Sequence, residues 1–70
     1  MNIGDNVRAV TWMMNDDEKE INAGTVGTVA FIRVINERIG IGPDRREVTV
    51  VDVVVGGVEF ASGAEDWEVV

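Results

Sequence analysis

Side chains branched at Cβ dominate this chain, and leucine is missing from it. The sequence contains 14 valines, six isoleucines and four threonines among 70 residues, and no leucine. Branching at Cβ restricts a side chain against a helical turn but packs well on a pleated sheet. Leucine is a strong helix former, so its absence also counts against helices. The composition therefore predicts an almost entirely β protein.

The length predicts a single domain that spans residues 1–70. A chain of this size buries only about 60% of the surface that its unfolded form exposes, so its stability margin is expected to be small. It contains no cysteine and no histidine, which leaves neither disulfides nor the usual zinc ligands to hold it together. The apolar core must therefore hold the fold, alone or with a partner surface.

Alternation of apolar and polar residues, with glycine-rich turns between the runs, predicts five strands. They cover residues 7–12, 25–35, 48–55, 58–61 and 67–70. A long acidic loop over residues 15–20 follows the first strand, and Ile21 anchors its far end to the core. Apolar residues occupy both parities of strand 25–35, which indicates a bent strand whose two halves bury different faces.

Two further connections are expected. Residues 36–47 are rich in turn formers and predict a long loop, in which Ile39 and Ile41 indicate a hairpin arm. Such long ordered loops are often functional. Residues 62–66 predict a turn, with one turn of 3₁₀ helix, before the last strand.

The Gly56-Gly57 pair predicts a tight hairpin, because both turn positions can adopt positive φ. The register then pairs Val55 with Val58, Val54 with Glu59, Val53 with Phe60 and Asp52 with Ala61. The expected core face consists of Val51, Val53, Val55, Val58 and Phe60. On the opposite face, Asp52 and Glu59 are expected to face water, whereas Val48, Val50 and Val54 need cover from a loop or from another molecule.

The net charge of −7 argues against nucleic acid and membrane partners, because the average field repels phosphate and anionic lipid. The charge is uneven: residues 33–47 carry four arginines against three acids, whereas the remainder carries two basic and ten acidic side chains. No apolar run approaches the roughly 18 residues of a membrane span. The start of the chain lacks signal-peptide features. A cytoplasmic location is expected because the chain contains no cysteine.

The residue inventory argues against an enzyme. Without cysteine or histidine, thiol catalysis, imidazole bases and the usual zinc sites are excluded. Ser62 is the only serine, and no base accompanies it in the sequence. No catalytic residue and no cofactor are therefore expected.

Three surface features each allow a functional interpretation and a purely structural one. The acidic loop suits Ca²⁺ or Mg²⁺ but lacks a spaced ligand pattern, so a solvated charge run is favoured. Trp12 with its two neighbouring methionines is either a binding hot spot or a cap on the end of the fold, whereas Trp67 is assigned to the core. The candidate protein-binding residues are Trp12, Met13, Met14, Asp16, Asp17, Glu18, Val48, Val50 and Val54.

The third feature is an arginine cluster. The candidate anion contacts are Arg33, Arg38, Arg45 and Arg46. Guanidinium groups bind phosphate and carboxylate well. The favoured alternative is a solvated arm that offsets the acidic remainder, including by self-association between unlike faces.

Four segments together resemble the SH3-like small β-barrel. They are residues 4–8 (GDNVR), 24–29 (GTVGTV), the hairpin 55–60 and residues 66–69 (DWEV). Similar layouts occur in the E-type peripheral subunit of photosystem I, in the variable chain of ferredoxin–thioredoxin reductase, in KOW-type domains and in small bacterial and phage proteins. The resemblance implies an all-β, five-stranded SH3-like small barrel with a long acidic first loop and a Gly-Gly hairpin.

Departures from these families guide the functional expectation. KOW-type RNA binders are usually basic, whereas this chain is acidic, and the absence of tyrosine removes a residue that grips polyproline in peptide-binding SH3 domains. The first hypothesis is a non-enzymatic interaction or scaffold module that docks on a larger protein or on itself. The alternatives are an acidic, phage-encoded inhibitor that mimics nucleic acid in a basic groove of a host enzyme, and a KOW-type nucleic-acid-binding barrel.

Overall fold

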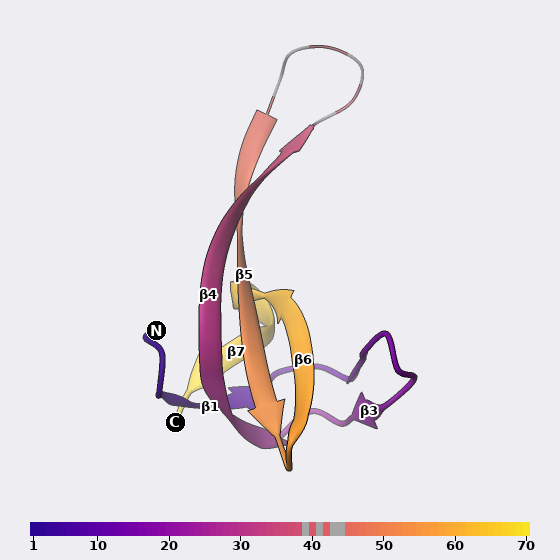
Figure 1. Ribbon diagram of the computed structural model, residues 1–70, viewed down its shortest axis with the longest axis vertical. Coiled ribbons are helices and arrows are strands. Elements are labelled where there is room, and N and C mark those ends of the chain that lie inside the picture. The colour runs from indigo at the N-terminus through magenta and orange to yellow at the C-terminus, as the bar shows by residue number, and fades with distance from the viewer. Residues whose placement is uncertain (39, 41, 43–44) are drawn as a thin grey trace.

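Five antiparallel strands form the main sheet in the computed structural model of the chain, which describes residues 1–38, 40, 42 and 45–70 (Figure 1). The elements are β1 (Asn6–Ala9), β2 (Met13–Met14), β3 (Glu20–Ile21), β4 (Val26–Arg38), β5 (Arg45–Val55), β6 (Val58–Gly63), the 3₁₀ turn η1 (Ala64–Asp66) and β7 (Trp67–Val69). The sheet order is β6-β5-β4-β1-β7, and β2 pairs with β3 in a small separate sheet. The predicted all-β class is confirmed. Among the described residues, no helix is long and apolar enough to cross a membrane.

The core lies on one face of the main sheet. Its members, each at most 4% exposed, are Val7, Ala9, Val29, Val51, Val53, Phe60 and Trp67. Half-buried side chains packed against them include Met13, Ile21, Ile32, Val55 and Val58. The predicted core face of the Gly-Gly hairpin, the anchoring role of Ile21 and the core assignment of Trp67 are thereby confirmed.

The β5–β6 hairpin has the register that the Gly-Gly pair predicts. Val55 faces Val58, and the three further predicted pairs follow in order. Gly56 and Gly57 have φ values of 56° and 81°, in the left-handed region that glycine adopts without steric cost. The turn chemistry is therefore sufficient to align both strands.

A β-bulge at Ala30 explains the mixed parity of β4. Val29 pairs with Val53, but the next pair joins Phe31 to Asp52, so Ala30 has no partner on β5. The extra residue shifts the side-chain alternation by one position. Val29 before the bulge and Ile32 after it therefore point to the same core, so the mixed parity comes from the bulge and the prediction that the two halves bury different faces is wrong.

Beyond the core, β4 and β5 continue as a two-stranded ribbon. Figure 1 shows this ribbon rising from the rest of the molecule, which we call the body. We define the arm as residues 33–38 of β4 and 45–50 of β5, which pair from Arg33 with Val50 to Arg38 with Arg45. The predicted hairpin is present, but the loop expected over residues 36–47 is wrong at both ends, because three residues on each side belong to strands. Ile39 and Ile41 lie outside the described residues.

In the main sheet, β1 lies between β4 and the last strand, β7. Strand β1 pairs with β4 through Val7 and Gly27 and with β7 through Val7 and Val69. It ends at Ala9, so the strand expected to reach Trp12 is three residues too long. The last strand, predicted over residues 67–70, forms as β7, and η1 provides the expected 3₁₀ turn before it.

Candidate protein-binding site

A recess of about 410 Å³ lies between the β2–β3 loop and the face of β4, β5 and β6 that points away from the core, which we call the outer face. The cross-strand pairs place Asp52 and Ala61 side by side on this face, with Glu59 one step along β6. The recess, named here the acidic pocket, is lined by Met14, Asn15, Asp16, Asp17, Arg33, Asp52, Glu59 and Ala61.

Asn15 fixes the loop that forms one wall of the acidic pocket. Its Nδ2 donates to the main-chain oxygen of Glu59 at 3.0 Å, which ties the loop to β6. Its Oδ1 accepts from the amides of Asp17 at 3.0 Å and Lys19 at 2.9 Å. Asparagine side chains stabilise turns in this manner because they replace a main-chain acceptor. The predicted loop is therefore confirmed as an ordered hairpin loop between β2 and β3.

Asp52 lies at the base of the acidic pocket and is only 8% exposed. Its carboxylate Oδ1 lies 3.5 Å from Arg33 Nη2, which provides its charge partner. The expectation that Asp52 faces water is wrong, because the loop and the neighbouring strands cover the outer face at this point. Glu59, predicted to face water on the same face, is exposed as expected.

Four carboxylates and one guanidinium gather in the acidic pocket. At close range and reduced dielectric, such an excess of negative charge favours a cationic group of a ligand or partner. In the part of the chain that the structure describes, no group of three or more acidic side chains is arranged to hold a metal ion. The excess of carboxylates suits a lysine or arginine side chain.

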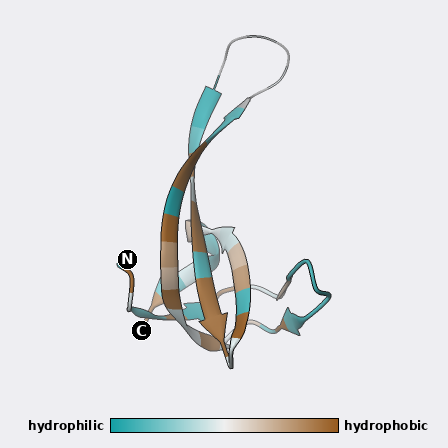
Figure 2. Ribbon diagram, viewed as in Figure 1, coloured by the Kyte–Doolittle hydropathy of each residue, from teal (hydrophilic) through white to brown (hydrophobic). Residues whose placement is uncertain are grey.

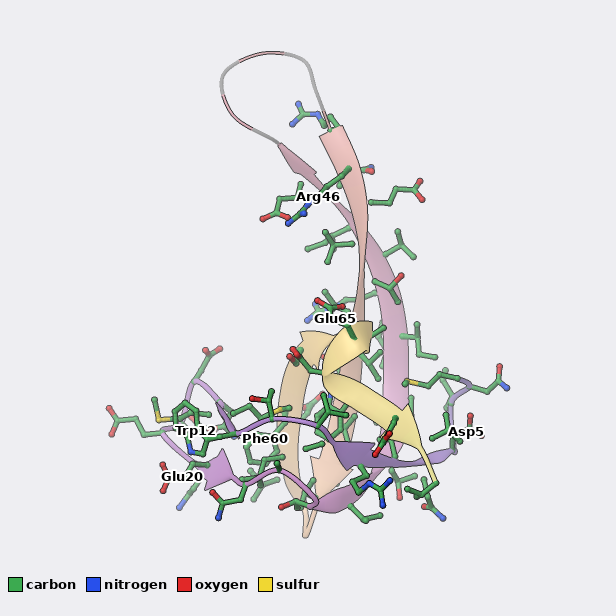
Figure 3. All side chains as sticks on the ribbon, turned by 180° about the vertical axis from the view of Figure 1, so that it is seen from behind. Asp5, Trp12, Glu20, Arg46, Phe60 and Glu65 are labelled. Atoms are coloured by element: carbon green, nitrogen blue, oxygen red, sulfur yellow. The ribbon has the colours of Figure 1, made fainter. Side chains whose placement is uncertain are left out.

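Apolar side chains accompany the acidic pocket on the β2–β3 lobe. Trp12 is 51% exposed, so about half of its surface is accessible to a partner. Met14 is exposed and lines the pocket, whereas Met13 faces Ile21 and packs on the core. Figure 3 shows Trp12 on this lobe, well away from Arg46 on the arm. Trp12 and Met14 are therefore surface residues, whereas Met13 packs against the core.

The other predicted binding residues lie apart from the acidic pocket. Val48, Val50 and Val54 all belong to the outer face, but Asp52 separates Val54 from the other two. Val54 is exposed and the other two are half-buried, so their predicted need for cover is met in part. Glu18 is exposed and does not line the pocket.

Two of the predicted anion contacts, Arg33 and Arg46, lie at different places in the fold. Arg33 lines the acidic pocket beside Asp52, and Arg46 pairs on the arm with Glu37 at 2.8 Å. Arg38 and Arg45 face each other across the last described pair of the arm. Two of the four guanidinium groups are thus matched by carboxylates of the same chain.

Sequence reasoning located the loop residues of the acidic pocket but not its other wall. Asp52, Glu59 and Ala61 were not selected, although the Gly-Gly register already places them on one face. Asn15 was not selected because its three side-chain hydrogen bonds depend on the folded loop and on β6. The sequence contains one signal for this wall. The β5–β6 register predicted from the Gly-Gly pair places Asp52, Glu59 and Ala61 on one face, and the acidic loop supplies the facing carboxylates.

No protein family, curated protein or solved structure matches this chain. The function is therefore argued from the site alone.

Proposed function

We propose that this protein is a non-enzymatic interaction module that docks on a larger protein through the acidic pocket and the neighbouring Trp12 and Met14. The single observation that carries the proposal is the convergence of Asp16, Asp17 and Glu59 around an open recess. A basic side chain of the partner would enter the recess. The exposed tryptophan and methionine would supply the apolar contact that dominates binding hot spots.

The fold proposed for this module is the SH3-like small barrel. Two features support it: the meander β1-β4-β5-β6 and the pairing of the last strand, β7, with β1. The acidic hairpin loop after β1 occupies the position of the long first loop of that fold. A non-enzymatic role is supported by the absence of cysteine and histidine, and a cytoplasmic location is proposed on the absence of cysteine.

The test compares two variants that remove equal charge. Asp17→Asn/Glu59→Gln changes the acidic pocket, whereas Glu20→Gln/Glu65→Gln changes acids outside it. A partner is first captured by crosslinking from the native host and identified. Its affinity for each purified variant is then measured by calorimetry. We expect the pocket variant to lose about tenfold or more in affinity, as truncated interface charges do, and the control to lose little.

A third variant, Trp12→Ala, tests the apolar half of the site. It should weaken binding to the same partner without changing the unfolding midpoint, because the side chain is half exposed. If the pocket variant and Trp12→Ala both bind like the unchanged protein, the docking site proposed here is wrong.

The acidic-inhibitor hypothesis makes a different prediction for the same pair of variants. Ten of the 12 charged side chains outside residues 33–47 are acidic, so a nucleic-acid mimic would bind a basic groove through its overall field. Both double variants would then weaken binding equally, and affinity would fall steeply with salt.

The KOW-type alternative has less support, because Arg33 and Arg46 are paired within the chain. A gel shift with single- and double-stranded nucleic acid at low salt is expected to show no complex.

A further inference from the structure

An apolar strip lies on the outer face of the arm. Ile35 lies directly across from Val48, and Val50 is the next outer-face residue toward the body. Ile35 is 46% exposed although it is an isoleucine in a regular strand. Figure 2 shows β4 as hydrophobic on both sides of a hydrophilic band, and hydrophilic again at its upper end. A ribbon of only two strands is marginally stable alone in water, so cover for this strip would stabilise it.

An ion pair borders the strip at each end. Toward the body, Arg33 Nη2 lies 3.5 Å from Asp52 Oδ1. Toward the tip, Arg46 Nη2 lies 2.8 Å from Glu37 Oε2. The outer face of the arm therefore has an apolar centre with one positive and one negative charge at either end. Interfaces with an apolar centre and a polar rim have this composition.

We propose that this strip binds the same strip of a second copy of the chain, with the two arms antiparallel and face to face. A two-fold axis through the position of Ile35 superimposes each arm on its partner in the reverse direction. Arg33 lies one outer-face position from Ile35 on the body side, and Glu37 lies one position away on the tip side. The axis therefore places Arg33 of each copy opposite Glu37 of the other. The charges on this face are therefore complementary to those of a second copy in this orientation.

The charge distribution favours a second copy over other occupants. Nucleic acid or an acidic partner would have to displace Glu37 and Asp52 from the arginines that they already hold. A basic partner is attracted to the acidic body rather than to the arm. Antiparallel arms place the two acidic bodies at opposite ends of the dimer. The six strand residues of the arm keep the bodies about 20 Å apart. This separation exceeds the Debye length of about 8 Å, so salt screens the repulsion between them.

The size of the strip sets the expected affinity. A ribbon face about 20 Å long and about 10 Å wide offers less than the roughly 800 Å² per partner of a standard interface. The dimer should therefore be weak, with a dissociation constant on the order of 10–100 μM. The strip shares Arg33 with the acidic pocket, but Ile35 and Val48 do not line the pocket, so Ile35→Lys can remove the dimer without changing the proposed docking site.

Sedimentation equilibrium of the full chain from about 5 μM to about 1 mM tests the dimer, a range that brackets the expected constant. Ile35→Lys should weaken it about tenfold or more, because it buries a charge at the two-fold axis. Val34→Lys is the matched control: Val34 is the preceding residue, is 59% exposed and lies on the opposite face of the same ribbon. Circular dichroism confirms that both variants keep the β fold.

A charge exchange provides a second test. Glu37→Arg places like charges at both ends of the dimer and should prevent it, and so should Arg33→Glu. Mixing these two variants should restore a heterodimer, because each end then joins an arginine to a glutamate. Should Arg33→Glu fail to fold, the lysine variants and the single Glu37→Arg variant still decide the question.

The proposal is overturned if the unchanged chain is monomeric throughout this range, or if Val34→Lys weakens the dimer as much as Ile35→Lys does. A monomer that still binds its captured partner through the acidic pocket would remove the dimer and leave the docking function intact.

Discussion

Val51 and Val53 are at most 1% exposed in the body, whereas Val34, on the same pair of strands, is 59% exposed in the arm. Both regions use β-branched residues, and both have regular antiparallel pairing. They differ in what covers them, because β6 reaches no further along the arm than Val50, and β1 and β7 lie on the body alone. Strand propensity therefore extends the ribbon, but only the neighbouring strands convert its apolar side chains into a core.

The largest contrast between the two regions should appear when a large side chain is truncated in each. Phe60→Ala removes a core side chain that is 3% exposed and should cost about 3–5 kcal/mol, comparable to the whole stability of so small a domain. Phe31→Ala truncates an exposed side chain of the same type at the base of the arm, and should cost less than about 1 kcal/mol. Urea unfolding followed by tryptophan fluorescence measures both.

The second prediction adds volume inside the body, where β4 pairs with β1 and passes close to β5. A Cβ at Gly27 would lie 2.7 Å from the main-chain oxygen of Val54 and 2.6 Å from Val53 Cγ1. Since the carbonyl is held in the sheet, Gly27→Ala should destabilise the protein by about 1–3 kcal/mol. The neighbouring exposed Thr28→Ala serves as the control. Equal unfolding midpoints for these two variants would show that the close approach at position 27 is not rigid.

The third prediction compares the partly buried ion pair Arg33–Asp52 with the exposed ion pair Arg46–Glu37 on the arm. Arg33→Ala leaves Asp52 buried without its partner and should cost about 1–3 kcal/mol. Arg46→Ala breaks a pair whose side chains are both more than half exposed, and should cost less than about 1 kcal/mol. Denaturant midpoints at a low protein concentration, where any dimer dissociates, separate the two. A larger loss for Arg46→Ala would mean that the arm is more tightly covered than the body.

The smallest effect on global stability is expected for the β2–β3 loop. Asn15→Ala removes the three side-chain hydrogen bonds that hold the loop, but water can reach the freed groups, so the cost should stay near about 1 kcal/mol. The local effect should be larger. Amide hydrogen exchange at Asp17 and Lys19 should accelerate while exchange in β5 remains unchanged. Unchanged exchange at both amides would show that the loop does not depend on Asn15.

How far the sequence predicts the structure depends on the range of the interactions involved. The β5–β6 register follows from two adjacent glycines, because a two-residue turn leaves one way to align the strands. The extent of the arm was underestimated, because Asn36, Glu37 and Arg46 have polar side chains that are typical of loops. They form strand because the ladder continues outward from the body, which is a property of the folded sheet.

The candidate site depends even more on distant contacts. Asp52 is covered by a loop more than 30 residues earlier in the chain and paired with Arg33 from the neighbouring strand. Local patterning predicts an exposed carboxylate at this position, since Val51 and Val53 on either side of it face the core. The two-residue strands β2 and β3 are too short to produce a pattern at all.

The bulge at Ala30 has an evolutionary consequence. Deleting this one residue would restore simple alternation and rotate every later position of β4 to the other side of the ribbon. Arg33 and Ile35 would then point inward, and Val34 would point outward, while β1, β5 and β6 kept their sequence. Loss of a single codon could therefore exchange the recognition surface of a descendant protein without a single amino-acid replacement.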